Sequence, residues 1–203
     1  MKHLAYCVFE TPLGVCGIAW REPENSSAPP AVTLLQLPEE TPRMTESRIA
    51  RSTGARQPSA PPPRIAAVIE KVCKHLRGEL QDFRDVPVDL EGVDAFARHV
   101  YEAAREIPPG QTRTYGDLAK ALSQQAPAPS ASASAAQAVG QVLARNPIPI
   151  IIPCHRVLAS GGKSGGFSAP GGRTTKARLL AIEGSASGLL PLDQTIFQSR
   201  GSK

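Results

Sequence analysis

The pattern of hydrophobic and polar positions predicts strands at the start of the chain and helices over most of the rest. Residues 4–9 and 15–20 have the composition of two short strands, and Pro12 and Gly14 supply turn chemistry between them. Residues 31–37 are a candidate third strand. These three segments predict a small sheet that precedes the helical part of the chain.

Hydrophobic residues then repeat at helical spacing. The positions from Ile65 to Leu76 that are apolar fall at i, i+3, i+4, i+7, i+8 and i+11, which places them on one helix face, and Gly78 can end this helix. Thr114 is the expected N-cap of a later helix, and Thr174 or Thr175 that of the last, which Gly184 ends. The four later helices are expected at about residues 93–107, 114–122, 134–145 and 174–183.

Two segments lack such periodicity. Residues 38–63 are polar and rich in proline, and we expect a long exposed loop that is partly disordered. Residues 123–134 are a low-complexity insert of Ser, Ala, Gln and Pro, which we expect as an exposed loop. Because this insert joins two short helices in a basic region, the arrangement favours a helix-turn-helix, although many helix pairs bind nothing.

One apolar run ends in a cysteine. Residues 148–152 are almost all isoleucine, which predicts a buried strand or extended segment that stops at Pro153. Cys154 then lies at the edge of the core beside His155, a potential base for a nucleophilic thiol. Adjacent residues of a strand point to opposite faces, so a water would relay the proton between them. Glu183 is the acid expected to orient the imidazole.

Composition places limits on the class of protein. The chain has 203 residues, 41% of them hydrophobic but only 4% aromatic, which allows one large or two small domains with a mostly aliphatic core. No apolar stretch approaches the roughly 20 residues of a membrane span, and the start does not have the pattern of a signal peptide. We therefore expect an intracellular protein without a membrane partner, in the cytoplasm or nucleoid, or in the nucleus of a eukaryote.

Charge is unevenly distributed along the chain. Residues 107–190 carry eight Lys or Arg and two acidic residues, a net charge of +6, whereas residues 1–106 carry 13 basic and 15 acidic residues, a net charge of −2. The half that holds Cys154 and His155 is therefore the basic half. This favours a polyanion such as nucleic acid as partner, with an ordinary basic surface as the alternative.

The other cysteines have no arrangement typical of a disulfide framework or a zinc finger. Cys7, Cys16 and Cys73 are far apart, and we expect packed thiols. A structural zinc site built from these residues with His3 or His75 is the alternative, but the spacing does not match a finger pattern. We expect no metal and no organic cofactor.

Around Cys154, the chain resembles the O6-alkylguanine-DNA alkyltransferases, which are also called methylated-DNA–protein-cysteine methyltransferases. The most specific match is Asn146-Pro147 followed by Pro153-Cys154-His155-Arg156. Residues 11–14 and 76–83 match the first domain of that family only loosely. The other matching stretches are residues 107–112, 114–119, 138–140, 148–152, 157, 167–168, 171–172 and 176–184.

The resemblance implies a role for each matching residue. Cys154 would accept the alkyl group from guanine O6, His155 would deprotonate it through a water, and Glu183 would orient His155. A depressed pKa of the Cys154 thiol is expected, because the thiolate is the nucleophile. Asn146 would shape the turn, and Tyr115 would donate to guanine N3 and protonate the leaving base. The residues expected to contact the flipped base or the DNA are Thr114, Ala135, Ala136, Gln137, Ala138, Gly140, Arg145, Arg156, Val157, Phe167 and Ser168.

The sequence departs from the family pattern at two places beside the DNA. Gln137 stands where the family usually has an arginine that fills the gap left by the flipped base, and glutamine lacks its charge and planar stacking. The insert at 123–134 lengthens the connection between the two helices. The small residues around Gln137 would let a helix approach the minor groove, or would only allow close packing in a core.

The resemblance thus implies a two-domain α/β monomer. Residues 1–90 would form a small ribonuclease H-like domain, residues 91–190 a mostly helical, winged-helix-like domain with a helix-turn-helix, and residues 191–203 a tail. The expected activity is a single irreversible transfer of an alkyl group from O6-alkylguanine, or O4-alkylthymine, in double-stranded DNA to Cys154. One alternative is a lesion sensor that transfers nothing, which Gln137 keeps open. Another is an unrelated cysteine hydrolase that turns over repeatedly.

Overall fold

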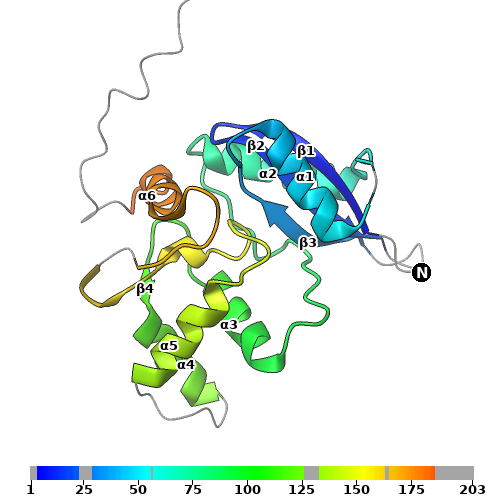
Figure 1. The fold of residues 1–203 in the computed structure, drawn as a ribbon. Helices are drawn as coiled ribbons and strands as arrows, with labels where there is room; N and C mark the ends of the chain where they lie inside the picture. The colour runs from blue at the N-terminus through cyan, green and yellow to red at the C-terminus, as the bar shows by residue number, and fades with distance from the viewer. Residues whose placement is uncertain (1–3, 23–28, 56, 126–132, 163–164, 186–203) are drawn as a thin grey trace, which may run out of the picture.

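The structure is a computed structural model of the chain. It describes residues 4–22, 29–55, 57–125, 133–162 and 165–185. Within these residues the fold is mixed α/β, with a small sheet in the first half and helices through the second (Figure 1). None of the described helices is long and apolar enough to cross a membrane.

The first half is built on a three-stranded antiparallel sheet. Its strands are β1 (Leu4–Thr11), β2 (Gly14–Arg21) and β3 (Ala31–Gln36), in the order β1-β2-β3, which confirms the three predicted strands. The central strand is buried on both faces, because Ile18 and Trp20 pack into the main core while Ala19 lies in a separate cluster on the other side. The sheet therefore needs a cover on each face.

Helix α1 (Pro42–Thr53) covers one face. It begins at Thr41, whose side chain accepts a hydrogen bond from the Met44 amide, and it ends at Gly54 in the left-handed region. Ile49 is its buried apolar residue and packs so closely on Gly17 of β2 that a Cβ there would lie 2.8 Å from the Ile49 Cδ1. The glycine is what allows the helix to approach the strand.

The prediction of an exposed loop over residues 38–63 is therefore wrong for residues 42–53. Position 56 lies outside the described residues, and residues 57–62 have no regular structure. The other face of the sheet is covered by α2 (Pro63–Leu76), the helix predicted from its apolar face. Ile65, Val72 and Leu76 of α2 lie in the main core with Ile18 and Trp20.

The second half carries the four later helices that were predicted. They are α3 (Ala95–Arg105), α4 (Tyr115–Gln125), α5 (Ala133–Leu143) and α6 (Gly172–Ile182), with short 3₁₀ turns η1 (Cys154–Arg156) and η2 (Ser160–Gly162). Both ends of the predicted loop at 123–134 belong to helices, and residues 126–132 lie outside the described residues. The N-cap of α6 is Gly171, not Thr174 or Thr175, because the chain enters the helix at a positive φ of 77°.

Two short strands connect the start of α4 to the cysteine segment. β4 (Arg113–Thr114) pairs in parallel with β5 (Val157–Leu158), the two residues that follow η1. Thr114 also caps α4 as predicted: its hydroxyl accepts from the Asp117 amide, and the Asp117 carboxylate accepts from the Thr114 amide. This pairing brings Tyr115 next to the residues around Cys154.

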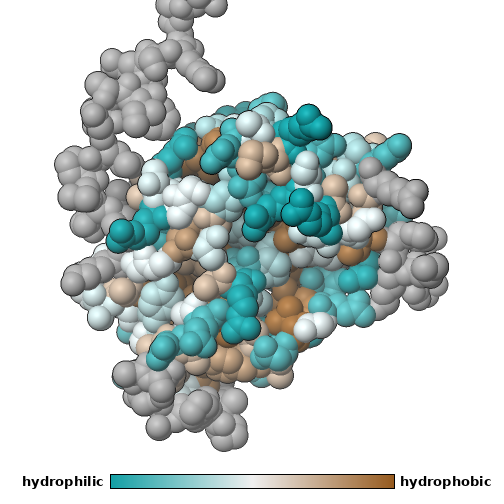
Figure 2. All heavy atoms as spheres, viewed as in Figure 1, coloured by the Kyte–Doolittle hydropathy of each residue, from teal (hydrophilic) through white to brown (hydrophobic). Residues whose placement is uncertain are grey.

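The two halves share one core and several direct contacts. The Leu35 amide of β3 donates to the Pro147 carbonyl at 3.0 Å, and the end of α2 lies against α6. Figure 2 shows hydrophobic residues at the surface in the hollow where the two parts meet. The sheet and its helices therefore form one wall of the region that holds the cysteine.

Candidate active site

The segment before Cys154 is a tight turn, not the predicted strand or extended segment. Ile150 has a φ of 73°, which is strained for a β-branched residue, and the Ile152 amide donates to the Ile148 carbonyl at 2.8 Å. Isoleucines 148 and 150–152 are all buried, so hydrophobic packing holds the strained backbone in place. The apolar run therefore marks burial, and the backbone reverses within it.

Asn146 holds this turn together. Its Oδ1 accepts from the Ile148 amide at 2.9 Å, and its Nδ2 donates to the Ile152 carbonyl at 2.8 Å and to Cys154 Sγ at 3.1 Å. One side chain thus fixes the start of the turn, its end and the sulfur. Because the amide donates to sulfur, it favours the thiolate over the thiol.

Cys154 is nearly buried, with 8% of its surface exposed. Burial raises the pKa of its thiol, and neither the Asn146 hydrogen bond nor the positive charge of Lys176 outweighs this effect. The expected depressed pKa is therefore wrong for the protein alone, because desolvation dominates at this depth. A thiol of this kind needs a base to become a nucleophile.

His155 is the neighbouring base, and it is held by Glu183. Its Nε2 lies 3.0 Å from Glu183 Oε1, and both side chains are fully buried. Because a carboxylate only accepts, Nε2 carries the proton and Nδ1 carries a lone pair. Nδ1 is buried and has no hydrogen-bond partner among the described residues. Burial also lowers the pKa of His155, against the opposing effect of Glu183, so the imidazole is neutral and ready to accept a proton.

Glu183 lies at the centre of a buried polar cluster. Burial alone would raise its pKa, but the hydrogen bonds from His155 and His75 and the neighbouring Arg156 hold the pKa well below its usual range. Arg156 forms a bidentate pair, with Nη2 at 2.7 Å from Oε1 and Nε at 3.0 Å from Oε2. The carboxylate is therefore ionised, and it is fixed in orientation by more than one partner.

Arg156 does not occupy the place expected of a DNA-binding residue. Only 4% of its surface is exposed, and besides Glu183 it donates to the Ile107 carbonyl. The side chain of Val157 is also fully buried, but the contact expected of Val157 is made by its backbone, so that expectation stays a prediction. Ala135 is buried in the core as well, which removes it from the expected DNA surface. The expected DNA contacts of Arg156 and Ala135 do not fit the burial of their side chains.

Lys176 is a buried cation that the sequence motifs did not single out. Its Nζ donates to the Val157 carbonyl at 2.6 Å and lies 5.9 Å from the centre of the Tyr115 ring. Burial lowers the pKa of Lys176 to about 8, while Cys154 acts in the opposite direction. The sequence held a signal, since Lys176 shares the spacing i, i+3, i+7 with Leu179 and Glu183 on the inward face of α6.

A cavity of about 760 Å³ opens on Cys154 from the side of α4 and α5. Tyr115 and Phe167 are half-buried in its walls, and Gln137 is an exposed residue of α5 on its border. Burial raises the pKa of Tyr115, so its hydroxyl keeps a proton that it can donate. Of the other expected contact residues, this cavity is lined by Thr114, Ala136, Gly140 and Ser168.

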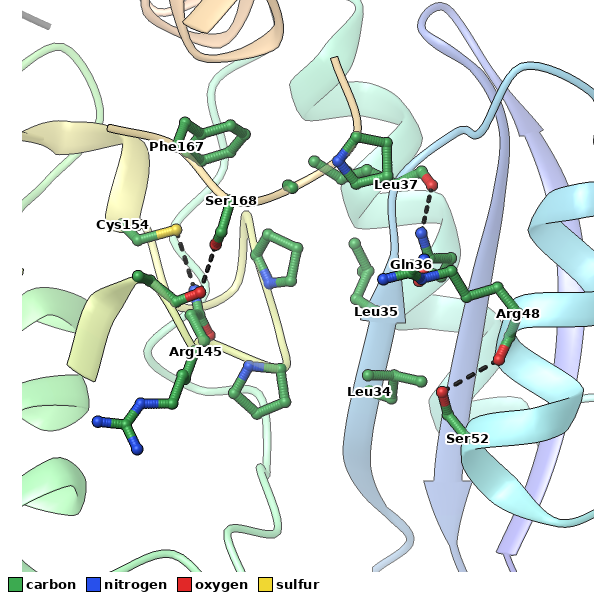
Figure 3. A pocket seen from close by; sticks show the side chains of 16 residues that line it. Leu34, Leu35, Gln36, Leu37, Arg48, Ser52, Arg145, Cys154, Phe167 and Ser168 are labelled. Atoms are coloured by element: carbon green, nitrogen blue, oxygen red, sulfur yellow. Dashed lines mark hydrogen bonds between the residues drawn. The ribbon is translucent and has the colours of Figure 1, made fainter. Parts of the chain in front are cut away.

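A second cavity, of about 370 Å³, reaches Cys154 from the side of the sheet (Figure 3). One wall comes from β3 and α1, with Leu34, Leu35 and Arg48, and the other comes from the segment at Phe167 and Ser168. Ser168 donates to the Ala144 carbonyl, which ties this segment to the end of α5. The segment therefore separates two openings to the same sulfur.

The remaining expected residues lie near these openings without lining the larger one. Arg145 is exposed, lines the smaller cavity and donates from Nε to the Gln141 carbonyl. Ala138 is half-buried on α5. Cys7, Cys16 and Cys73 are buried free thiols, His3 lies outside the described residues, and no group of three or more potential metal ligands occurs in the described part of the chain.

Comparisons with known proteins agree on one family. The family model described as 6-O-methylguanine DNA methyltransferase, DNA binding domain, matches residues 95–185. A methylated-DNA–protein-cysteine methyltransferase of Mycolicibacterium paratuberculosis is 34% identical over 194 residues, which cover 96% of this chain and 99% of that protein. A protein of the same name from Mycobacterium bovis is 40% identical over 136 residues, covering 67% of this chain and 73% of its own length.

Solved structures show the same likeness. The crystal structure of Mycobacterium tuberculosis OGT in complex with DNA is similar with a TM-score of 0.64 and 32% identity, covering 90% of this chain and 94% of that one. The O6-methylguanine-DNA methyltransferase of Pyrococcus kodakaraensis is similar with a TM-score of 0.61 and 32% identity, covering 89% and 99%. With a relative above 30% identity that spans almost the whole chain, this protein belongs to the methylated-DNA–protein-cysteine methyltransferases, the enzymes of direct-reversal DNA repair.

Proposed function

We propose that this protein removes a methyl or larger alkyl group from O6 of guanine in double-stranded DNA and keeps it on Cys154. The observation that carries the proposal is the position of the Cys154 sulfur. The sulfur borders the cavity of about 760 Å³ beside α4 and α5, Asn146 donates a hydrogen bond to it, and His155, the next residue, is held by Glu183. O4-alkylthymine offers the same kind of carbon and is the second candidate substrate.

The proposed step is a displacement at the alkyl carbon. Cys154 Sγ attacks that carbon, a sulfur–carbon bond forms, and the bond from carbon to guanine O6 breaks. The thiol proton passes through a water to Nδ1 of His155, while Nε2 keeps its hydrogen bond to Glu183. Tyr115 donates a proton to guanine N3 and recovers it from His155 through solvent, so the thiol proton ends on the leaving base.

The raised pKa of Cys154 fits a nucleophile that is activated only at the moment of reaction. A buried neutral thiol is protected from other electrophiles until a base accepts its proton. Asn146 and Lys176 then stabilise the negative sulfur, through a hydrogen bond and through charge. The thioether that forms is stable, which makes the reaction stoichiometric and independent of any cofactor.

The DNA would lie across α4 and α5 as a helix-turn-helix, with the lesion flipped into the larger cavity. Residues 113–145, which include both helices, carry the exposed cations Arg113, Lys120 and Arg145, which would contact phosphates. Gln137 would enter the gap in the duplex. Ala136, Ala138 and Gly140 would let α5 approach the minor groove, and Ser168 and Phe167 would hold the base and wall the alkyl group.

The finer organisation that we propose follows the family. Residues 1–90 would form a ribonuclease H-like domain, residues 91–190 a winged-helix-like domain, and residues 191–203 a tail. The protein would act as a monomer on DNA in the cytoplasm or nucleoid, or in a nucleus. Arg156 receives a new role, as the partner that keeps Glu183 ionised and oriented.

The test is the intact mass of the protein after incubation with duplex DNA containing O6-methylguanine. We expect wild type to gain the mass of one methylene unit, which a methyl group adds on replacing the thiol hydrogen, and Cys154→Ser to gain nothing. Lesion-selective binding without any gain in mass would favour the sensor, with Gln137 as the missing step. Release of modified product in repeated turnovers would favour a hydrolase and contradict the proposal.

A further inference from the structure

A second histidine reaches the carboxylate of Glu183 from the other half of the chain. His75 lies in the last turn of α2, is fully buried, and its Nε2 is 2.9 Å from Glu183 Oε1. The His155 Nε2 approaches the same oxygen at 3.0 Å. One carboxylate oxygen therefore lies between two imidazoles, and only one of these belongs to the cysteine segment.

The protonation state of His75 follows from its second nitrogen. Nδ1 accepts a hydrogen bond from the Gln81 backbone amide at 3.1 Å, so Nδ1 carries no proton. The proton must then be on Nε2, and His75 donates it to Glu183. The edge of the ring packs against Phe83, with ring centres 5.2 Å apart and planes at 70°. His75 is thus held as a neutral donor of fixed direction.

This donor limits where the Glu183 carboxylate can lie. Oε1 also accepts from Arg156 Nη2 at 2.7 Å, and the Gly110 amide approaches Oε2 at 3.5 Å. Oε1 therefore accepts from His75, Arg156 and His155 together, so donors on several sides fix the position of the carboxylate. Without His75 the carboxylate would keep its pair with Arg156 but would be free to rotate toward it, away from His155.

We propose that His75 is a positioning residue for the alkyl transfer, which fixes Glu183 so that His155 keeps its proton on Nε2 and its lone pair on Nδ1. The proposal rests on the function proposed above. It also links the halves of the molecule, because α2 packs on the sheet and yet supplies a direct partner of the catalytic machinery. The first half would then contribute to the chemistry and not only to folding.

Two amide substitutions separate the two hydrogen bonds of His75. His75→Gln places an amide nitrogen near the position of Nε2, so it keeps a donor to Glu183 and loses the acceptor for the Gln81 amide. His75→Asn places its amide oxygen near Nδ1, so it keeps that acceptor and is too short to reach Glu183. Each variant loses one buried hydrogen bond, so each is expected to be less stable than wild type, and urea unfolding confirms that both are folded.

The measurement is the single-turnover rate of methyl transfer at saturating O6-methylguanine duplex, together with duplex affinity and urea unfolding. We expect His75→Asn to transfer about tenfold more slowly than His75→Gln, the effect of one hydrogen bond to a charged group. Duplex affinity should be equal in both variants, because His75 is buried away from the DNA. Equal transfer rates in two folded variants would overturn the proposal.

A second measurement needs no substitution. Correlation of ring nitrogens with ring protons by NMR, in ¹⁵N-histidine-labelled wild type, reports which nitrogen of His75 is protonated. We expect the proton on Nε2, and an Nε2 without a proton would overturn the proposal because His75 could not then donate to Glu183. Failure of wild type to accept any methyl group would instead refute the proposed function, so the two failures are distinguishable.

Discussion

The buried cluster around Glu183 and the exposed face of α5 differ in almost every physical respect. In the cluster, Glu183, His155 and Arg156 are buried, and both His155 and Arg156 form hydrogen bonds to Glu183. On the face, Gln137 is exposed and its neighbours Ala136 and Gly140 are small. The comparison teaches that chemistry and recognition are carried by different kinds of structure. Substitutions in the cluster should lower the free energy of unfolding, while substitutions on the exposed face of α5 should change function without changing stability.

The largest effect is expected from Glu183→Gln. The substitution removes the negative charge and leaves the Arg156 cation buried without its partner, which should lower the free energy of unfolding by about 3–5 kcal/mol. Methyl transfer should also slow, because a neutral amide replaces the charged acceptor that holds and orients His155. Urea unfolding and single-turnover kinetics measure the two effects, with the exposed Glu102→Gln as control. A loss of stability no greater than that of the control would contradict the cluster's role.

The buried Lys176 should make the stability of the folded protein depend on pH in the alkaline range. Its pKa is about 8 in the folded protein and near the ordinary value of 10.5 when unfolded, so below pH 8 the folded state carries the full cost of a buried charge. Between pH 8 and 10.5 the folded state binds fewer protons than the unfolded state, so the free energy of unfolding should rise with pH. Over this range wild type should gain up to about 3 kcal/mol of stability relative to Lys176→Met.

Urea unfolding of wild type and Lys176→Met from pH 7 to 10 measures this difference. The exposed Lys120→Met serves as control, and its difference from wild type should not change over the same range. A constant difference between wild type and Lys176→Met would show that Lys176 has an ordinary pKa. That result would contradict the account in which burial lowers the pKa of Lys176.

The smallest effect on stability, and a gain in function, is expected from Gln137→Arg. Arginine would add charge and a planar group where the flipped base leaves the duplex, so transfer from the duplex should become faster. Stability should change by no more than about 0.5 kcal/mol, because the position is exposed. Gln141→Arg adds the same charge one turn later on α5 and is the matched control. Equal acceleration in both variants would indicate general attraction to DNA and not a role of position 137.

The strands and most helices could be predicted because their signals are local. Composition and turn residues predicted the strands, helical spacing predicted α2, and Thr114 marked the start of α4. Helix α1 was missed although Thr41-Pro42 and Gly54 are ordinary start and stop signals. Its surface is almost wholly polar, and its one buried apolar residue, Ile49, packs where Gly17 makes room. No periodic pattern can reveal such a helix.

The partners of Glu183 could not be predicted in the same way. His75 is separated from Glu183 by more than a hundred positions, and only the packing of α2 against α6 brings them together. Arg156 counted toward a basic surface in the sequence, yet it and Lys176 are buried, so they neutralise the interior and not the DNA. The turn at Ile150 was also hidden, because a run of isoleucines predicts burial and β structure equally well.

The most direct test of the central claim is the stoichiometry of transfer with the lesion duplex in excess. The account predicts that each protein molecule accepts one methyl group, that peptide mapping finds it on Cys154, and that repaired DNA never exceeds protein. The buried thiols of Cys7, Cys16 and Cys73 should stay unmodified. Repaired DNA in excess of protein, or a methyl group on another residue of active wild type, would contradict the account.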